Sequence, residues 1–267
     1  MKDRLNNVNK TLYIPLYGKA YVSKRSLFLK DPKAEEIWEA EQFPLKGKAA
    51  SKWLALYMGI RSAVFDGWLK EITEDVENAT VIHIGCGMDS RILRVGSECL
   101  AWYDVDFPEV IKERKHYYTE NGSYKMISAD IRNSGWLSEI PENKKAVVVM
   151  EGVSMYLTLG ELQTALKEIC DHFDEVEILM DCYTVLAAKM SKYKNPINDV
   201  GVTSVYGIDD PLILQTDGLV YVKEHNMIPQ KYVDELQGRE KLIFAKLYGG
   251  GLSKRLYKLY EFKKYAK

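Results

Sequence analysis

The sequence predicts an α/β fold in which a mainly parallel sheet follows a mostly helical N-terminal section. From residue 79 onward, short apolar runs alternate with helix-like stretches at intervals of roughly 20 to 30 residues, as crossovers between parallel strands require. Runs such as AVVVM at 146–150 lack a polar side, which suits strands covered on both faces. We therefore expect one domain, with a helical extension or lid over residues 1–75 and the core over residues 76–267.

Two helices are expected in the N-terminal section. In KDPKAEEIW, Asp31 is placed to cap a helix and Pro32 to occupy its first position. A longer helix is expected over residues 51–72, where apolar side chains recur three and four positions apart. Arg61 interrupts this apolar stripe. A buried guanidinium needs an anionic partner, which is either a carboxylate of a ligand or an acidic side chain of the protein.

The rest of the chain predicts seven strands. They are TVIHIG (80–85), LAWYDV (100–105), YKMIS (124–128), AVVVM (146–150), VEILMD (176–181), and a closing pair, GLVYVKEH (218–225) and RLYKLYEFKK (255–264). Helices are expected between them, for example in PEVIKERKHYY and LGELQTALKEICDHF.

Glycines and acidic residues recur where these strands end. Gly85 and Gly87 follow the first strand, Asp104 and Asp106 mark the second, Asp130 follows the third and Glu151 the fourth. Because ligands of an open α/β sheet bind beyond the carboxyl ends of its strands, we expect these residues to share one site. Helix capping and solvated loop charge are the alternative roles of the same acids.

The pattern favours a nucleoside ligand without phosphates. Asp106 lies 19 residues beyond Gly87, close to the separation of about 20 at which a βαβ unit presents an acid to ribose hydroxyls. The dinucleotide fingerprint G-x-G-x-x-G/A has Ser90 at its third small position, and the adjacent Asp89 would repel a pyrophosphate. A positively charged nucleoside such as S-adenosylmethionine fits this turn better than NAD does.

Four ordered segments, TVIHIGCGMDSRILR, AWYDVDFPEVIKERK, SADIR and VVVMEGVSMYL, resemble the leucine carboxyl methyltransferase family. The bacterial branch of polyketide-type O-methyltransferases is the closer match, and TLYIPLYGKAYVSK, DPKA and YGIDDP resemble it too, so that the resemblance covers most of residues 11–215. It implies a class I methyltransferase (Rossmann-like) fold, with a seven-stranded mainly parallel sheet, helices on both faces and a helical N-terminal extension. It also implies S-adenosylmethionine as methyl donor. Because the methyl group of this donor is already activated, we expect no metal.

The resemblance further implies a set of cofactor contacts. They are Lys19 as the N-terminal basic residue, Arg61 as the partner of the cofactor's carboxylate, Gly85 and Gly87 as the turn, Asp106 as the ribose acid, Asp130 with Ile131 on the adenine side, and Glu151 after the fourth strand. The region beyond residue 215 departs most from the family, and the acceptor is not named by the sequence.

The expected reaction is direct displacement, in which an acceptor oxygen attacks the sulfonium methyl group and S-adenosylhomocysteine leaves. A carboxylate acceptor is ionised at neutral pH, whereas a hydroxyl acceptor needs a general base. The candidate bases are His116, His172 and His225, while His83 inside the first strand is expected to be structural. The candidates for the acceptor pocket are Tyr156, Tyr183 and Tyr206, with core packing as their alternative role, and Asp209 and Asp210 either line the same opening or shape a turn.

Composition narrows the possible partners. The 37 Lys and Arg balance the 38 Asp and Glu, which argues against a protein that grips nucleic acid or an anionic membrane. Four scattered cysteines (Cys86, Cys99, Cys170 and Cys182), the lack of a secretory signal and the absence of any membrane-length apolar run favour a cytoplasmic enzyme that acts on a small molecule. Two alternatives are kept, namely an NAD(P)-dependent Rossmann oxidoreductase and a non-catalytic module that binds S-adenosylmethionine or RNA.

Overall fold

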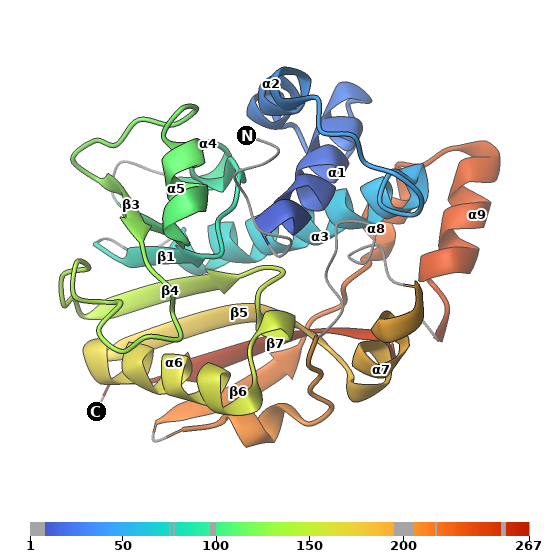
Figure 1. The fold of residues 1–267 in the computed structure, drawn as a ribbon. Coiled ribbons are helices and arrows are strands. Elements are labelled where there is room, and N and C mark those ends of the chain that lie inside the picture. Colours follow the sequence, from blue (N-terminus) through green and yellow to red (C-terminus); the bar gives the residue numbers. More distant parts are fainter. Residues whose placement is uncertain are drawn as a thin grey trace.

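Seven strands form a single sheet in the order β3-β2-β1-β4-β5-β7-β6 (Figure 1). The computed structural model describes residues 9–74, 76, 78–96, 100–194, 205–216, 218–251 and 255–266. The strands are β1 (Thr80–Ile84), β2 (Ala101–Asp106), β3 (Tyr124–Ser128), β4 (Lys145–Met150), β5 (Glu175–Tyr183), β6 (Leu219–Glu224) and β7 (Tyr257–Lys264). The first five are parallel neighbours, and β7 runs antiparallel to both β5 and β6.

Helices cover both faces of this sheet. They are α1 (Tyr13–Lys24), α2 (Pro32–Glu41), α3 (Lys52–Thr73), α4 (Arg91–Val95), α5 (Pro108–Arg114), α6 (Leu159–His172), α7 (Val185–Lys194), α8 (Gln230–Asp234) and α9 (Gly238–Tyr248), with 3-10 turns η1 (Asn9–Leu12), η2 (Ser154–Tyr156) and η4 (Pro211–Leu214). None of the helices in the described ranges has the length and apolar character needed to cross a bilayer.

Alternate residues of the central strands supply two hydrophobic cores. Val147 and Val149 of β4 face the core that contains α1, α2 and α3, whereas Val148 and Met150 face the core under α6. Residues Ala146–Met150 are fully buried, because both faces of this strand are covered. The apolar run at 146–150 therefore reports a central parallel strand, as predicted.

The N-terminal section packs on the sheet through closely spaced helices. A Cβ atom at Gly18 of α1 would lie 2.6 Å from the Cβ atom of Met58 in α3, so the two backbones meet where one helix has no side chain. Asp31 caps α2, with its side chain 2.9 Å from the amide nitrogen of Ala34. Ser51 caps α3 in the same way. The close approach at Gly18 packs α1 against α3, and α3 packs along the sheet in the core that also contains Val147 and Val149 (Figure 1).

The predicted fold class is confirmed in its sheet, its strand positions and its helical N-terminal section. The strands differ from the expected ranges by one or two residues, and the largest difference is at β5, which continues to Tyr183. Because β5 extends past Asp181, this acid lies inside the strand, beside the first residues of β7.

Candidate active site at the carboxyl ends of the strands

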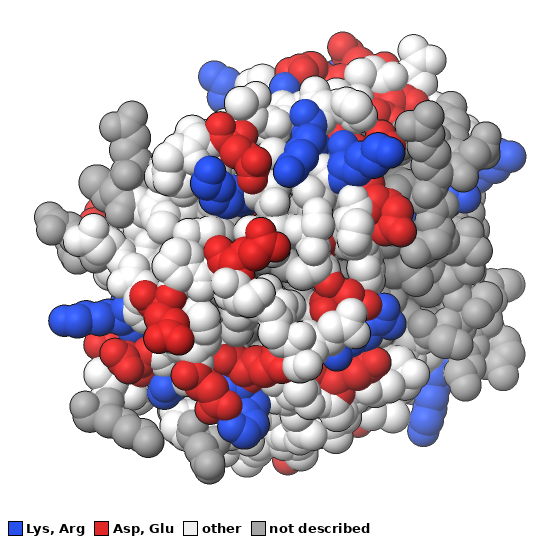
Figure 2. All heavy atoms as spheres, turned by 60° about the vertical axis from the view of Figure 1, so that its left-hand side comes forward, with Lys and Arg blue, Asp and Glu red and all other residues white. Residues whose placement is uncertain are grey.

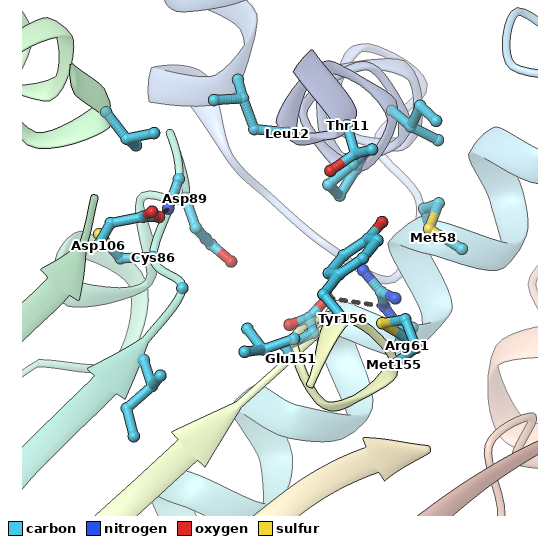
Figure 3. Close-up of a pocket in the computed structure, with 18 of the residues that line it drawn as sticks. Thr11, Leu12, Met58, Arg61, Cys86, Asp89, Asp106, Glu151, Met155 and Tyr156 are labelled. Carbon is cyan, nitrogen blue, oxygen red and sulfur yellow. Dashed lines mark hydrogen bonds and ion pairs between the residues drawn. The ribbon is translucent and has the colours of Figure 1, made fainter. Parts of the chain in front are cut away.

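A pocket of about 1100 Å³ lies beyond the carboxyl ends of β1, β2, β4 and β5, beneath the N-terminal helices (Figure 3). In Figure 3, Thr11 and Leu12 lie on the opposite side of the pocket from Glu151, and the hydroxyl of Tyr156 points across the pocket toward Thr11, with which it forms a hydrogen bond. All the residues predicted to contact a cofactor line this pocket, namely Lys19, Arg61, Gly85, Gly87, Asp106, Asp130, Ile131 and Glu151. Tyr156 and Tyr183 line it as well, whereas Tyr206 is not among the lining residues and is half exposed.

The glycine turn after β1 is needed by the protein's own packing. Gly85 and Gly87 have φ values of +66° and +50°, which L side chains rarely adopt. A Cβ atom at Gly85 would lie 2.2 Å from Cγ2 of Val153, and one at Gly87 would lie 3.3 Å from the Cβ atom of Leu12. The turn therefore presents bare backbone to the pocket and at the same time lets the β4 loop and η1 approach it.

Asp106, the last residue of β2, closes this turn. Its two carboxylate oxygens accept hydrogen bonds from the amides of Gly87 and Phe107, each 2.8 Å long. Burial raises the pKa of Asp106 to about 6, against the opposing effect of the two amides. Asp104, two residues earlier, is fully buried and bonded to Arg114 and Tyr124, so only Asp106 faces the pocket.

Asp130 and Ile131 form the wall of the pocket beyond β3. The Asp130 carboxylate pairs with Arg132, whose Nε lies 2.9 Å from Oδ1 and which lowers the pKa of the acid. The guanidinium of Arg132 also lies over the ring of Phe107, with its Cζ atom 5.7 Å from the ring centroid. This side of the pocket therefore combines an ionised acid with apolar surface, which suits a purine ring.

Arg61 of α3 points into the pocket from below Tyr156 (Figure 3). Its Nε donates to Glu151 over 2.9 Å, and one terminal nitrogen donates to Asp181 over 3.1 Å and to the hydroxyl of Tyr257 over 2.9 Å. Burial opposes the charge of Arg61, but Tyr257, Glu151 and Asp181 together hold its pKa well above the ordinary value. The structural ion pair, one of the two alternatives for Arg61, is thus present.

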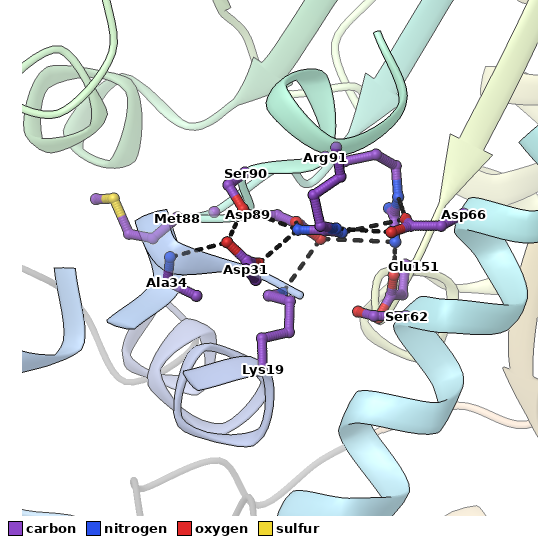
Figure 4. A network of polar contacts seen from close by, with 12 residues as sticks. Lys19, Asp31, Ala34, Ser62, Asp66, Met88, Asp89, Ser90, Arg91 and Glu151 are labelled. Carbon is purple, nitrogen blue, oxygen red and sulfur yellow. Dashed lines mark hydrogen bonds and ion pairs between the residues drawn. The ribbon is translucent and has the colours of Figure 1, made fainter. Parts of the chain in front are cut away.

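A buried ion network joins Glu151, the partner of Arg61, to Arg91, Asp89 and Lys19 (Figure 4). Glu151 also accepts from Arg91, and although burial favours its neutral form, Arg91 and Arg61 lower the pKa of Glu151 to about 2. Asp89 pairs with Lys19 over 3.2 Å and with Arg94 over 2.9 Å. The reasoning that Asp89 repels a pyrophosphate considered its charge alone, whereas in the structure Lys19, Arg94 and Arg91 surround this carboxylate.

At the end of the pocket opposite the glycine turn, tyrosines form the wall between α3, α7, α9 and the start of β7. The lining tyrosines are Tyr57, Tyr156, Tyr183, Tyr248 and Tyr257, accompanied by Leu54, Met58, Met155, Met190 and Leu256. Asp209 and Asp210 do not line the pocket; instead, Asp209 accepts from the amide of Val185 at the start of α7 and Asp210 from the amide of Leu212 in η4. Tyr57, Tyr257 and Asp181 were missed by the sequence reasoning, although Asp181 follows the same rule of an acid near a strand end.

The three candidate bases lie away from the pocket. His116 is largely exposed, His172 bonds the carbonyl of Ile140 over 2.8 Å, and His225 pairs with Glu261. His83 does line the pocket, but it is held between Asp104 and Arg91, and burial lowers its pKa, as a structural histidine requires. No group of metal-ligating side chains is found in the described parts of the chain.

The cysteines that the structure describes are free thiols, and the surface carries charges of both signs on the face shown in Figure 2. Cys86, Cys170 and Cys182 are buried and unpaired with one another, and Cys99 lies outside the described residues. On the face shown in Figure 2, acidic and basic side chains are interspersed and neither sign forms a continuous patch.

Comparison with known proteins agrees with this geometry. The sequence model of the leucine carboxyl methyltransferase family matches residues 12–170, more than half of the chain. The chain is 28% identical over 247 residues to the tetracenomycin polyketide synthesis O-methyltransferase TcmP of Streptomyces glaucescens, covering 91% of each chain. It is 30% identical over 191 residues to the S-adenosyl-L-methionine-dependent methyltransferase dpfgK of Gibberella zeae, covering 65% of this chain and 64% of that one.

Solved structures share the fold at low sequence identity. The magnesium protoporphyrin IX methyltransferase ChlM of Synechocystis, with bound S-adenosylmethionine, superposes with a TM-score of 0.53 at 9% identity, covering 97% of this chain and 98% of that one. The plantazolicin methyltransferase BamL gives a TM-score of 0.50 at 11% identity over the same shares.

Proposed function

The chain belongs to the leucine carboxyl methyltransferase family and is an S-adenosylmethionine-dependent methyltransferase, and we propose that its pocket holds the cofactor at the glycine end and a small aromatic acceptor at the tyrosine end. The observation that carries the proposal is one continuous cavity lined by Asp106 and Arg61 at one end and by five tyrosines at the other. The similarity to a polyketide O-methyltransferase supports an oxygen acceptor on a small molecule.

The residues at the glycine end fit an S-adenosyl group. The turn at Gly85 and Gly87 brings backbone into the pocket, and Asp106 offers carboxylate oxygens to a ribose diol beside it. Asp130 is held ionised and can accept from an adenine amino group. Among the described residues, Arg61 uses Nε and one terminal nitrogen on protein groups, which leaves its second terminal nitrogen for the carboxylate of the cofactor.

Bound S-adenosylmethionine supplies a methyl group that is already activated by its sulfonium. The chain's contribution is to orient the acceptor and to exclude water, and such positioning is worth on the order of 7–11 kcal/mol. Tyr156 and Met155 come from the loop after β4, next to Glu151, so they lie between the two ends of the pocket. We place Tyr156 at the acceptor oxygen for this reason.

The tyrosine end favours an acceptor that needs no general base. The lining residues that the structure describes include no histidine except His83, which is already bonded on both ring nitrogens. Burial raises the pKa of Tyr156 and of Tyr257 above the ordinary value, so neither phenol is a base at neutral pH. A carboxylate is ionised without help. We therefore propose that the acceptor is an aromatic carboxylic acid and the product its methyl ester.

A dual-function probe tests this proposal. The full chain is incubated with S-adenosylmethionine and an anthraquinone that carries one carboxyl and one phenol group, and the methylated product is analysed by mass spectrometry before and after mild alkali. We expect a single methyl group that alkali removes, as an ester requires. The matched control is the same anthraquinone with its carboxyl converted to an amide, which should not be methylated. A methyl group that survives alkali, on either compound, would assign the reaction to the phenol.

A further inference from the structure

Arg61 is held by two residues that lie far from it in the sequence and outside the matched family segment. Asp181, in β5, accepts from the terminal nitrogen of Arg61 over 3.1 Å and from the amide of Gly152 over 2.7 Å. Tyr257, the first residue of β7, accepts from the same nitrogen over 2.9 Å and donates its own hydroxyl proton to Asp181. The three polar groups thus form a closed triangle, and all three side chains are buried.

We propose that Asp181 and Tyr257 are positioning residues that fix the guanidinium of Arg61 so that its second terminal nitrogen faces the cofactor's carboxylate. The proposal rests on the function proposed above. Glu151 restrains the guanidinium at Nε, and the pair Asp181–Tyr257 restrains it at one terminal nitrogen. A planar group held at these two edges is restrained against rotation, and with respect to the residues that the structure describes its remaining nitrogen is the one available to a ligand.

The strand pairing explains why Tyr257 reaches this arginine. β7 runs antiparallel to β5, and Tyr257 pairs with Tyr183 in the register of the two strands. The start of β7 therefore lies at the same edge of the sheet as the end of β5, where the pocket opens. A phenol at this position reaches Asp181, whereas a residue one position along the strand would face the other side of the sheet.

The ring of Tyr257 serves a different surface from its hydroxyl. The ring packs edge-on against Tyr183, with centroids 5.0 Å apart, and lies 6.2 Å from the ring of Tyr57. Tyr57 in turn stacks on Tyr248 of α9 at 4.9 Å. One side chain thus borders both ends of the pocket, with its hydroxyl on the arginine and its ring in the tyrosine wall, and the two roles can be separated by removing the hydroxyl alone.

The test compares two ligands in one conservative variant. Tyr257→Phe keeps the ring and removes the hydroxyl, and calorimetry measures the Kd for S-adenosylhomocysteine and for its decarboxylated form, which lacks only the carboxylate. We expect about tenfold weaker binding of S-adenosylhomocysteine, since a charge-assisted contact is misaligned, and less than about twofold change for the decarboxylated ligand. The acceptor's KM should stay unchanged, because the tyrosine wall is intact. Asp181→Asn, which keeps the acceptor for the Gly152 amide, should show the same selectivity.

A control variant and a double-mutant cycle complete the design. Tyr260→Phe removes another buried hydroxyl from the same strand, one that lies outside the pocket, and should leave both affinities unchanged. In an Arg61→Ala background, adding Tyr257→Phe should have no further effect on S-adenosylhomocysteine, because the two residues act through one contact.

The outcomes separate this inference from the function on which it rests. Equal losses for both ligands in Tyr257→Phe, or additive losses in the cycle, would mean that the hydroxyl only supports the fold. Unchanged binding in Tyr257→Phe, together with weakened binding in Arg61→Ala, would overturn the inference and leave the proposed function standing. A wild-type chain that binds neither ligand would overturn the proposed function itself.

Discussion

Asp106 is the residue at which pH should control cofactor binding. Burial raises its pKa to about 6, and only the ionised carboxylate can accept hydrogen bonds from both hydroxyls of a ribose. The Kd for S-adenosylhomocysteine should therefore be constant above about pH 7 and rise by about tenfold for each pH unit below about 6. Titration calorimetry between pH 5 and pH 8 measures this profile.

The matching variants locate the effect at one side chain. Asp106→Asn should bind weakly at every pH and lose the acid-dependent part of the profile, and Asp106→Ala should cost about 1–3 kcal/mol of binding free energy at neutral pH. A wild-type affinity at pH 5 equal to that at pH 8 would remove Asp106 from the ribose site.

At this scale the sequence was informative where a side chain's role depends on its place along one strand. The positions of Asp106 and Glu151 in the pocket could be predicted because each lies where a strand ends. In a parallel sheet, such residues come together at one edge. Asp89 and Tyr257 could not be understood in this way. The charge of Asp89 is compensated by Lys19 of α1, which is distant in the sequence, as well as by Arg94 of the following helix α4. The role of Tyr257 depends on the antiparallel pairing of β7.

The turn between β1 and α4 depends on two glycines, and one of them offers a controlled test at the scale of the element. Gly85→Ala combines an unfavourable positive φ with a Cβ atom 2.2 Å from Val153. Gly135→Ala has an equally positive φ of +80° but no heavy atom within 4 Å of the added Cβ. We expect Gly135→Ala to lower the free energy of unfolding by about 1 kcal/mol.

Gly85→Ala should cost at least about 2 kcal/mol more than this control, because the β4 loop has to move away from the turn. Urea denaturation at pH 7 gives both values. If the two variants were equally stable, the contact between the turn and Val153 would not be tight in solution.

The cap of α2 connects that helix to the cofactor end of the pocket. Asp31 is 1% exposed, accepts from the amide of Ala34, and pairs with Arg94 over 2.6 Å. Asp31→Ala should therefore lower the free energy of unfolding by about 3 kcal/mol, through a lost cap and a buried arginine with one partner fewer. Asp210, an exposed aspartate that caps η4 over 2.9 Å, is the matched control, and Asp210→Ala should cost about 0.5–1 kcal/mol. Similar losses in the two variants would contradict the role of the Arg94 contact.

Elements with a clear contrast between apolar and polar faces could be predicted, and those without it could not. The helix α6 buries Leu162, Leu166 and Ile169 on one face and was expected from its spacing. The helices α7 and α9 leave large apolar side chains exposed, including Met190 and Leu242, so the periodicity that marks a buried face is weak. Since these two helices border the tyrosine end of the pocket, this end was also the part of the pocket that the sequence predicted least.

In the molecule as a whole, the N-terminal section and the sheet share one hydrophobic core and one ion network. Leu16 and Phe65 belong to the same core as Val147 and Leu179 of the central strands. The network adds Lys19 and Arg61 from the helices to acids at the strand ends. The boundary expected near residue 75 therefore does not separate two hydrophobic cores, and we propose that the extension forms part of the site rather than a lid that opens freely.

Acid sensitivity should follow from this network. Arg91 and Arg61 outweigh burial and lower the pKa of Glu151 from the ordinary 4.5 to about 2, and Arg114 with His83 likewise lowers that of Asp104 from 3.8 to about 2. An acid whose pKa is lower in the folded state contributes stability above its unfolded pKa and loses it as the pH falls toward the folded value. As the pH falls from 6 to 3, the stabilising contribution of Glu151 to the free energy of unfolding should thus decrease by about 2 kcal/mol.

Asp106 has the opposite effect on stability as the pH falls, so its contribution can be separated from that of Glu151. Its pKa is higher in the folded state, so its contribution grows as the pH falls from about 6 to about 4. Urea denaturation should therefore show a shallow dependence of the unfolding free energy on pH down to about 4.5 and a steep loss below it.

The variant Glu151→Gln should be less stable at pH 7, because two arginines lose an anionic partner, but its loss of stability below pH 4.5 should be smaller by about 2 kcal/mol. Asp171→Asn, which removes an exposed acid paired with Lys167, should keep the wild-type profile. If the unfolding free energy of Glu151→Gln varied with pH in parallel with that of the wild type, the ion network at the strand ends would not be the cause of the acid sensitivity.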